Sequence, residues 1–122
     1  MKFEVAFQSR RRYLHAVVTG ANSRENVAGY LEAILNECLS RRITRVLIEE
    51  RLEGPRLGMV DVFDIAAEGS GRIAGMFESI AFVDVYAVGG TMKFAETVAL
   101  NRGAPLRVFA TVAEAREWLE GL

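Results

Sequence analysis

The side chains with the widest chemical scope in this chain are its carboxylates, which gather in three places. Three glutamates lie within residues 49–53, Asp61 and Asp64 follow, and Asp84 interrupts an apolar run. Loops after parallel strands meet at one edge of a sheet, where ligands usually bind in open α/β folds. The three glutamates, which follow an apolar run of their own, are therefore predicted to lie on such an edge.

Asp84 is the carboxylate with the most apolar sequence around it. It follows Ala81-Phe82-Val83 in a run that is expected to be buried, and a buried carboxylate needs a compensating partner. Arg102 or Arg107 could supply the opposite charge. We therefore interpret Asp84 as one half of a structural ion pair rather than a catalytic acid, and expect its removal to reduce stability.

His15 and Cys38 do not form a catalytic or metal-binding arrangement. His15 is the only histidine and lies in a strand-like segment, so we expect a buried or sheet-face imidazole with no nucleophile to activate. Cys38 falls on the apolar stripe of a predicted helix and is expected to be a buried thiol. One histidine and one cysteine cannot assemble a zinc site without unusual carboxylate ligation. The sequence thus predicts no enzymatic activity, no metal and no cofactor.

Two glycine-containing segments are candidates for phosphate-binding loops. Residues 69–74 match the dinucleotide fingerprint in letters, but a predicted helix precedes them where the fingerprint needs a strand. The turn Gly89-Gly90-Thr91 follows an apolar strand and precedes a helix, although it lacks the lysine and the glycine spacing of a P-loop. We interpret it as a tight turn with Thr91 as the helix N-cap. Together with Tyr86 it is a candidate rim for an anion or another ligand.

The composition describes an ordinary globular chain. It has 122 residues, 51% of them hydrophobic and 25% charged, with a net charge of −1. This balance predicts one domain over residues 1–122 and no attraction to nucleic acid or to anionic lipid. No apolar run approaches the roughly 20 residues that span a bilayer, no signal peptide is visible, and one cysteine cannot form an internal disulfide. We expect a cytoplasmic protein.

Alternating strands and helices are expected to position these residues. Residues 2–9 alternate polar and apolar side chains, and residues 13–19 form a second strand joined to the first by a hairpin. Asn22 is the predicted N-cap of a helix that ends near Ser40. The remaining expected elements are a strand at 45–49, a loop at 51–58, a helix from 59 to about 68, a strand at 79–86, a helix ending before 103–105, a strand at 106–109, and a helix opened by the capping box of Thr111 and Glu114.

The predicted order is therefore β-β-α-β-α-β-α-β-α. Strands separated by helices require crossover connections, so most of the sheet is expected to be parallel, while the opening hairpin adds an antiparallel edge. The fold class is α/β, with a single mixed sheet of about five strands covered by helices. Glycines at 69, 71 and 75 are expected to end the second helix early.

The last forty or so residues also resemble a known family in their amino-acid sequence. Ala81-Phe82-Val83-Asp84, Phe94-Ala95-Glu96 before Asn101-Arg102-Gly103, Val108-Phe109, and Glu114-Ala115 with Trp118-Leu119 resemble small bacterial proteins of the STAS-like (SpoIIAA-like) class. That class is grouped with sporulation anti-sigma-factor antagonists and with the STAS domains of sulfate transporters. The resemblance implies a non-enzymatic interaction or regulatory module whose docking on a protein partner is controlled by phosphorylation of a serine or threonine after the third strand.

The sequence departs from this pattern at the switch position. Residues 49–59 contain no serine and no threonine, and the nearest hydroxyls, Thr44 and Ser70, lie beyond an element on either side. We therefore expect an interaction module without the phosphoswitch. The surface predicted to bind a protein partner is the loop after the third strand with the start of the next helix: Glu49, Glu50, Arg51, Arg56, Met59, Asp61 and Asp64. A homodimer is also expected, because the edge strands of such a sheet need cover.

An alternative function is the binding of a small apolar or lipid-like ligand between the second helix and the sheet. Met59, Met76 and Met92 are spread over the helices and their ends, and methionine adapts its shape to apolar ligands. A filled core would favour the interaction module, and an internal apolar cavity would favour the ligand-binding module.

Overall fold

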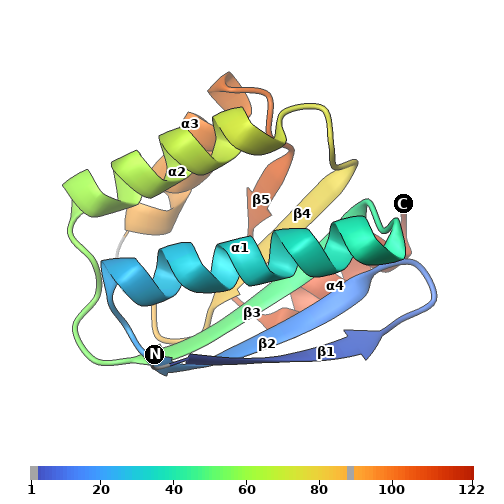
Figure 1. The fold of residues 1–122 in the computed structure, drawn as a ribbon, viewed down its shortest axis with the longest axis horizontal. Coiled ribbons are helices and arrows are strands. Elements are labelled where there is room, and N and C mark those ends of the chain that lie inside the picture. The colour runs from blue at the N-terminus through green and yellow to red at the C-terminus, as the bar shows by residue number, and fades with distance from the viewer. Residues whose placement is uncertain (1–2, 88–89) are drawn as a thin grey trace.

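The computed structural model describes residues 3–87 and 90–122. The predicted order of elements is confirmed (Figure 1). The elements are β1 (Phe3–Ser9), β2 (Leu14–Ala21), α1 (Arg24–Arg41), β3 (Arg45–Glu53), α2 (Met59–Ile73), β4 (Ser79–Asp84), α3 (Thr91–Asn101), β5 (Leu106–Val108) and α4 (Val112–Glu120).

The strands of the sheet lie in the order in which they occur in the chain, β1-β2-β3-β4-β5. β1 and β2 pair antiparallel, with Phe3 opposite Gly20 and Ser9 opposite Leu14, and the other neighbours pair parallel. In this register Glu50 of β3 is opposite Asp84 of β4. The sheet therefore places two carboxylates side by side at the carboxyl end of its central strands.

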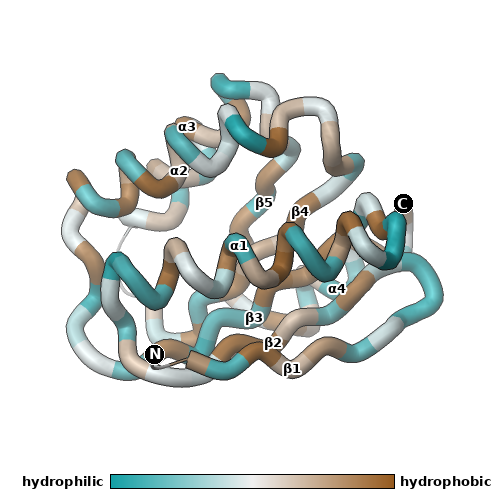
Figure 2. The backbone as a smooth tube through the Cα atoms, in the orientation of Figure 1, coloured by the Kyte–Doolittle hydropathy of each residue, from teal (hydrophilic) through white to brown (hydrophobic). Residues whose placement is uncertain are grey.

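The helices cover the two faces of the sheet unequally. α1, α2 and α3 lie on one face of the sheet (Figure 1). On that face, side chains of β2, β3 and β4 form the larger core cluster with α1. α4 packs on the other face against Tyr13, Leu47, Ala81 and Val83. Hydrophobic and hydrophilic residues alternate along α1 and α2 (Figure 2). The side chains of β3 alternate between these two cores, as the pleat of a strand requires.

Two predicted element boundaries are wrong in the region that matters most. β3 continues past the predicted end at Glu49 to Glu53, so Arg51 belongs to the strand instead of a loop. Glu49 and Glu50, predicted to face a protein partner, are only 6% exposed. The loop is limited to the segment between Glu53 and Met59. α2 continues through Gly69 and Gly71 to Ile73, because Ile65 and Ile73 pack against the larger core and offset the weak helix propensity of glycine.

The helix caps also differ in part from the prediction. Ser23, not Asn22, caps α1, and its side chain accepts a hydrogen bond from the Asn26 amide. Gly90 is the N-cap residue of α3, so Thr91 is the first helical residue and makes no capping bond. The Thr111 cap of α4 is confirmed, since its hydroxyl accepts a hydrogen bond from the Glu114 amide at 3.2 Å.

Candidate functional site

An apolar cavity of about 250 Å³ lies between the sheet and the helices α1, α2 and α3. Its walls come from the inner faces of all three helices and from the face of the sheet that they cover. Apolar side chains dominate the lining, and they include Val27, Leu31, Ile34, Val46, Ile48, Val62, Ile65, Ala66, Ile73, Phe77, Ile80, Phe82, Met92, Ala95 and Leu106. The larger core is therefore hollow where α2 passes over the sheet.

The geometry of α2 explains the cavity. Of its fifteen residues only Ser70 is fully buried, and the helix packs mainly on α3 rather than on the sheet. Its inner face carries half-buried side chains such as Val62, Ile65 and Ile73. The exposed Glu32 and Arg72 also line the cavity, so it reaches the surface between α1 and α2. α2 thus covers the cavity without filling it.

Two sets of exposed ion pairs connect α1 to α2 across this opening. Arg24 at the start of α1 bonds Asp61 at 2.8 Å and Asp64 at 3.3 Å. Arg72 near the end of α2 bonds Glu32 at 2.9 Å. Asp61 and Asp64 were predicted to face a protein partner, but both form ion pairs with Arg24 of the same chain. Few apolar contacts join the two helices here, so these ion pairs hold them together.

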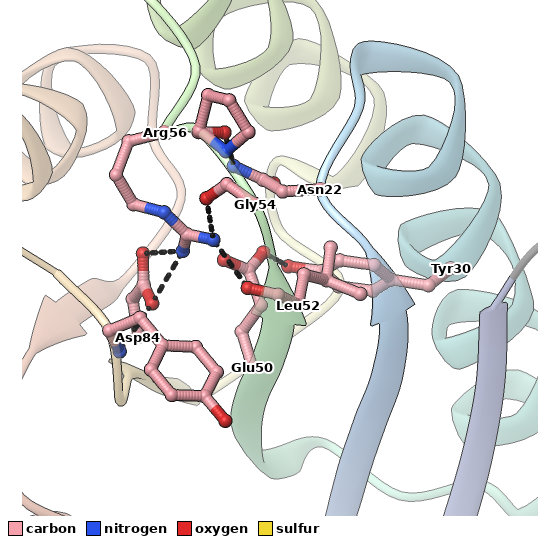
Figure 3. A network of polar contacts seen from close by, with 9 residues as sticks. Asn22, Tyr30, Glu50, Leu52, Gly54, Arg56 and Asp84 are labelled. Atoms are coloured by element: carbon pink, nitrogen blue, oxygen red, sulfur yellow. Dashed lines mark hydrogen bonds and ion pairs between the residues drawn. The ribbon is translucent and has the colours of Figure 1, made fainter.

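One end of the cavity is polar, and Arg56 is at its centre (Figure 3). The Nη1 atom of Arg56 lies 3.0 Å from both carboxylate oxygens of Asp84. Its Nη2 atom donates to the carbonyl oxygens of Leu52 and Gly54. Asp84 also accepts a hydrogen bond of 2.9 Å from the Tyr86 amide. This arrangement fixes the loop after β3 to the end of β4.

The prediction that Asp84 forms an ion pair with an arginine is correct, but the predicted partners are wrong. Arg56 fills this role, and the Asp84 side chain is 7% exposed. Arg102 lies over the ring of Phe63, and Arg107 over the rings of Phe109 and Trp118. Both predicted arginines therefore stack on aromatic rings, an arrangement that favours guanidinium groups.

Glu50 lies beside this ion pair on the wall of the cavity. The hydroxyl of Tyr30, which is fully buried on α1, donates a hydrogen bond to its Oε2 atom. Burial raises the pKa of Glu50 to about 7, with a further contribution from the negative charge of Asp84. Burial beside Glu50 also raises the pKa of Tyr30 well above its ordinary value. The polar end of the cavity therefore holds two neighbouring carboxyl groups and one guanidinium.

The opposite face of the sheet carries a second polar cluster. The Oε1 atom of Glu49 lies 2.8 Å from Nε2 of His15, and its Oε2 atom accepts a hydrogen bond of 2.5 Å from Nε of Arg51. His15 is buried as predicted, at 5% exposure, and its Nδ1 atom has no hydrogen-bond partner within the described residues. Cys38 is also buried as predicted, and burial raises its pKa to about 11. Glu49 therefore belongs to neither the cavity nor an exposed loop.

The other predicted site residues are only partly brought together. Arg51 and Met59 are exposed, and Met59 begins an exposed apolar stretch with Val60. Tyr86 is exposed, and the Arg56 guanidinium lies 5.8 Å from the centre of its ring. Thr91 lines the cavity. Gly90 is exposed, and Gly89 lies outside the described residues.

Sequence reasoning missed three contributors to the site. It did not single out Tyr30, because a tyrosine on the apolar stripe of a helix is typical of a core. It placed Asn22 at a helix start, whereas the Asn22 side chain donates to the Pro55 carbonyl and holds the Arg56 loop. It expected a ligand between the second helix and the sheet, but it did not single out Val62, Ile65 and Ile73 of α2, which line the cavity. The carboxylate within an apolar strand was the one usable signal, and it led to Asp84.

The solved structures that match this chain include two that cover nearly its whole length. One is an anti-sigma factor antagonist from Mycobacterium paratuberculosis, with a TM-score of 0.60, 18% identity, and coverage of 97% of this chain and 94% of that chain. The other is an uncharacterized protein from Shewanella loihica that has a SpoIIAA-like fold, with a TM-score of 0.54, 16% identity, and coverage of 97% and 93%. The chain has the SpoIIAA-like fold. No family model and no curated protein matches its sequence.

The STAS-like resemblance seen in the sequence is thus confirmed at the level of the fold. Within this SpoIIAA-like fold, the cavity lies on the face covered by α1, α2 and α3. None of the helices in the described residues is both long and apolar enough to cross a membrane. In the same residues, no three His, Cys, Asp or Glu side chains converge as metal ligands would.

Proposed function

We propose that this chain is a non-catalytic module that binds a small amphipathic ligand under α2. The observation that carries this proposal is the apolar cavity of about 250 Å³ with a polar end. Of the two functions considered from the sequence, an internal apolar cavity favours ligand binding over a plain interaction surface. Ligand binding, which was the alternative from the sequence, is therefore the first proposal, and the protein-interaction module is the second.

The size and lining of the cavity support a ligand with a short apolar body. An engineered protein cavity of about 150 Å³ is enough to bind benzene, and typical ligand pockets begin at about 300 Å³. Burying each CH₂ group contributes about 0.8 kcal/mol, so an eight-carbon chain gains about 6 kcal/mol before the costs of association. That gain is comparable to the lower estimates of the cost of association, about 4 kcal/mol, so a contact of the polar group must add to the affinity.

The first experiment is native mass spectrometry of protein purified gently from its own host. A discrete adduct of low mass is the expected result, because a ligand pocket buries most of the surface of its ligand. Extraction and mass measurement of the adduct would then identify it. Bare protein in repeated preparations, together with no binding of added amphipathic probes, would contradict the proposal.

Two glycines of α2 provide a matched pair of variants for this experiment. Gly69 lines the cavity and Gly71 does not, and a Cβ atom at either position would meet no atom within 4 Å. Both Gly69→Leu and Gly71→Leu should raise helix propensity by about 1 kcal/mol. Only the leucine at position 69 should occupy cavity volume and abolish the adduct. Loss of the adduct in both variants would show that it binds elsewhere.

The second candidate function is docking on a protein partner, as expected from the STAS-like resemblance. One solved structure with this fold is an anti-sigma factor antagonist. The specific observation in favour is the exposed apolar start of α2, where Met59 is 57% exposed and Val60 is 74% exposed. Affinity purification from the host should then yield one stoichiometric partner that is absent with Val60→Asp. The same set of captured proteins with both baits would contradict this second function.

A further inference from the structure

The polar end of the cavity provides information about the head group of its ligand. Three ionisable side chains meet there, with Arg56 between the loop and β4, and with Glu50 and Asp84 on adjacent strands. Tyr30 adds one hydroxyl from α1. The hydrogen bonds that these groups already make decide which head group they can accept.

An anionic head group would find both terminal nitrogens of Arg56 already occupied, which leaves the single Nε–H among the five donors of this guanidinium. One terminal nitrogen of Arg56 is held by both oxygens of Asp84, and the other by the carbonyl oxygens of Leu52 and Gly54. An incoming carboxylate would have to displace these partners and would then face two carboxyl groups at close range. Like charges at such distances are strongly unfavourable in a site removed from water.

A cationic head group finds the opposite situation at Glu50. Asp84 is compensated by Arg56, whereas the one side-chain donor that Glu50 has among the described residues is the hydroxyl of Tyr30. Its neighbour across the sheet is another carboxyl group. Glu50 is therefore a buried acceptor on an apolar wall that makes no ion pair of its own among the described residues, and the nearby Arg56, which pairs with Asp84, only partly offsets its negative charge.

We propose that the cavity binds a primary aliphatic amine, with its ammonium group on Glu50 and its alkyl chain between α2 and the sheet. This inference rests on the proposed ligand-binding function. An ammonium group supplies three donors, enough for the free acceptor positions of Glu50. It also brings the positive charge that this carboxylate lacks.

The test uses three probes with the same eight-carbon chain, n-octylamine, n-octanol and octanoate, titrated calorimetrically into the purified protein. Octylamine should bind at least about tenfold more tightly than octanol, as a charge-assisted hydrogen bond predicts, and octanoate should bind most weakly. Octanol or octanoate binding as tightly as octylamine would overturn the amine assignment and leave the proposed function intact. Failure of all three probes to bind would overturn both.

Two neighbouring glutamates provide the variant and its control. Glu50→Gln keeps the shape of the side chain and removes its charge, so it should abolish the preference for octylamine over octanol. Glu49→Gln makes the same change one residue away on the opposite face of the sheet, and the preference should persist. An unchanged preference in Glu50→Gln would overturn the assignment.

The pH dependence of binding is a second measurement that requires no variant. Octylamine affinity in the wild-type protein should rise from pH 6 to pH 8, because Glu50 gains its negative charge over this range beside Tyr30, Asp84 and Arg56. Octanol affinity should not rise in the same way. An octylamine affinity independent of pH would overturn the role of Glu50.

Discussion

Glu49 and Glu50 are adjacent in the chain and equally buried, yet they serve different structures. Glu49 joins His15 and Arg51 on the face of the sheet that α4 covers in part. Glu50 faces Tyr30, and Asp84 lies next to it across the sheet, on the wall of the cavity. Successive side chains of a strand point to opposite faces of the sheet, so a substitution at position 49 perturbs one face and a substitution at position 50 perturbs the other. Individual substitutions in β3 can therefore be assigned to one face.

Asp84 should matter for stability through Arg56. Asp84→Ala leaves the Arg56 guanidinium, whose side chain is 20% exposed, without its carboxylate. We expect the free energy of unfolding to fall by about 2–3 kcal/mol, less than for a fully buried pair. Denaturant unfolding measures this change. Asp64→Ala, which removes an exposed pair with Arg24, should cost less than about 1 kcal/mol, and equal costs for the two variants would contradict this account.

Glu50 should make stability depend on pH in a specific direction. The pKa of its carboxyl is raised from 4.5 to about 7 in the folded protein, so folding takes up a proton between these values. The free energy of unfolding should therefore fall as pH rises from about 4.5 to about 7, by on the order of 3 kcal/mol from this group. Unfolding curves across this range measure the decrease.

Glu50→Gln isolates this contribution, because glutamine resembles the protonated carboxyl and cannot ionise. The variant should be as stable as the wild type near pH 5 and more stable at pH 8. A difference between the two proteins that stays constant with pH would contradict the shifted pKa. Carboxylates that do not contact Glu50, such as Glu96 with its lowered pKa, affect both proteins equally and cancel in the comparison.

At the residue scale, the sequence predicted which residue needed a partner but not which partner it has. Asp84 was recognisable because a carboxylate interrupts an apolar run. Arg56 was not, because its position depends on how the loop after β3 folds back over β4, held by the Asn22 side chain from a distant turn. The spacing of residues in the sequence does not indicate an ion-pair partner whose position depends on the conformation of a loop.

At the scale of elements, α2 is the unusual part of the molecule. It lies over the cavity, packs mainly on α3, and is tied to α1 by exposed ion pairs. α1, in contrast, buries Tyr30, Ile34 and Cys38 in the larger core. Local stability follows buried apolar contact, so α2 should open more readily than α1.

The ion pairs between α1 and α2 can be tested by hydrogen exchange. In the double variant Arg24→Ala/Arg72→Ala, amides of α2 should exchange up to about tenfold faster, since exposed pairs contribute about 0.2–1 kcal/mol each. Amides of α1 should be unaffected by comparison. Lys93→Ala removes an exposed pair within α3 and is the matched control. Unchanged exchange in α2 would show that these pairs do not hold it.

The boundaries of β3 and α2 show why sequence alone misplaced this region. The charged stretch Glu50-Arg51 and Glu53 is typical of a loop, but pairing with β2 as far as Ala21 keeps it in the sheet. Gly69 and Gly71 weaken a helix locally, but contacts of Ile65 and Ile73 with the larger core extend α2 past them. Both errors arise where contacts distant in sequence override local preference.

At the scale of the whole molecule, β1 and β5 form the two edges of the sheet. β5 has three residues, whereas β1 has seven and presents a longer unpaired edge. The expected homodimer would cover such an edge. Sedimentation equilibrium over a range of concentrations should then give twice the chain mass of 13.5 kDa. A mass of 13.5 kDa at every concentration would rule out a stable dimer.

The order of the strands has a consequence for synthesis. Because each strand pairs with the one made just before it, the sheet can grow at a single edge as the chain leaves the ribosome. No later strand has to insert between two strands that have already paired. The apolar β4 pairs with β3, which has already been synthesised, and α4 is made last and covers the second face. Vectorial folding is therefore compatible with this topology at every stage.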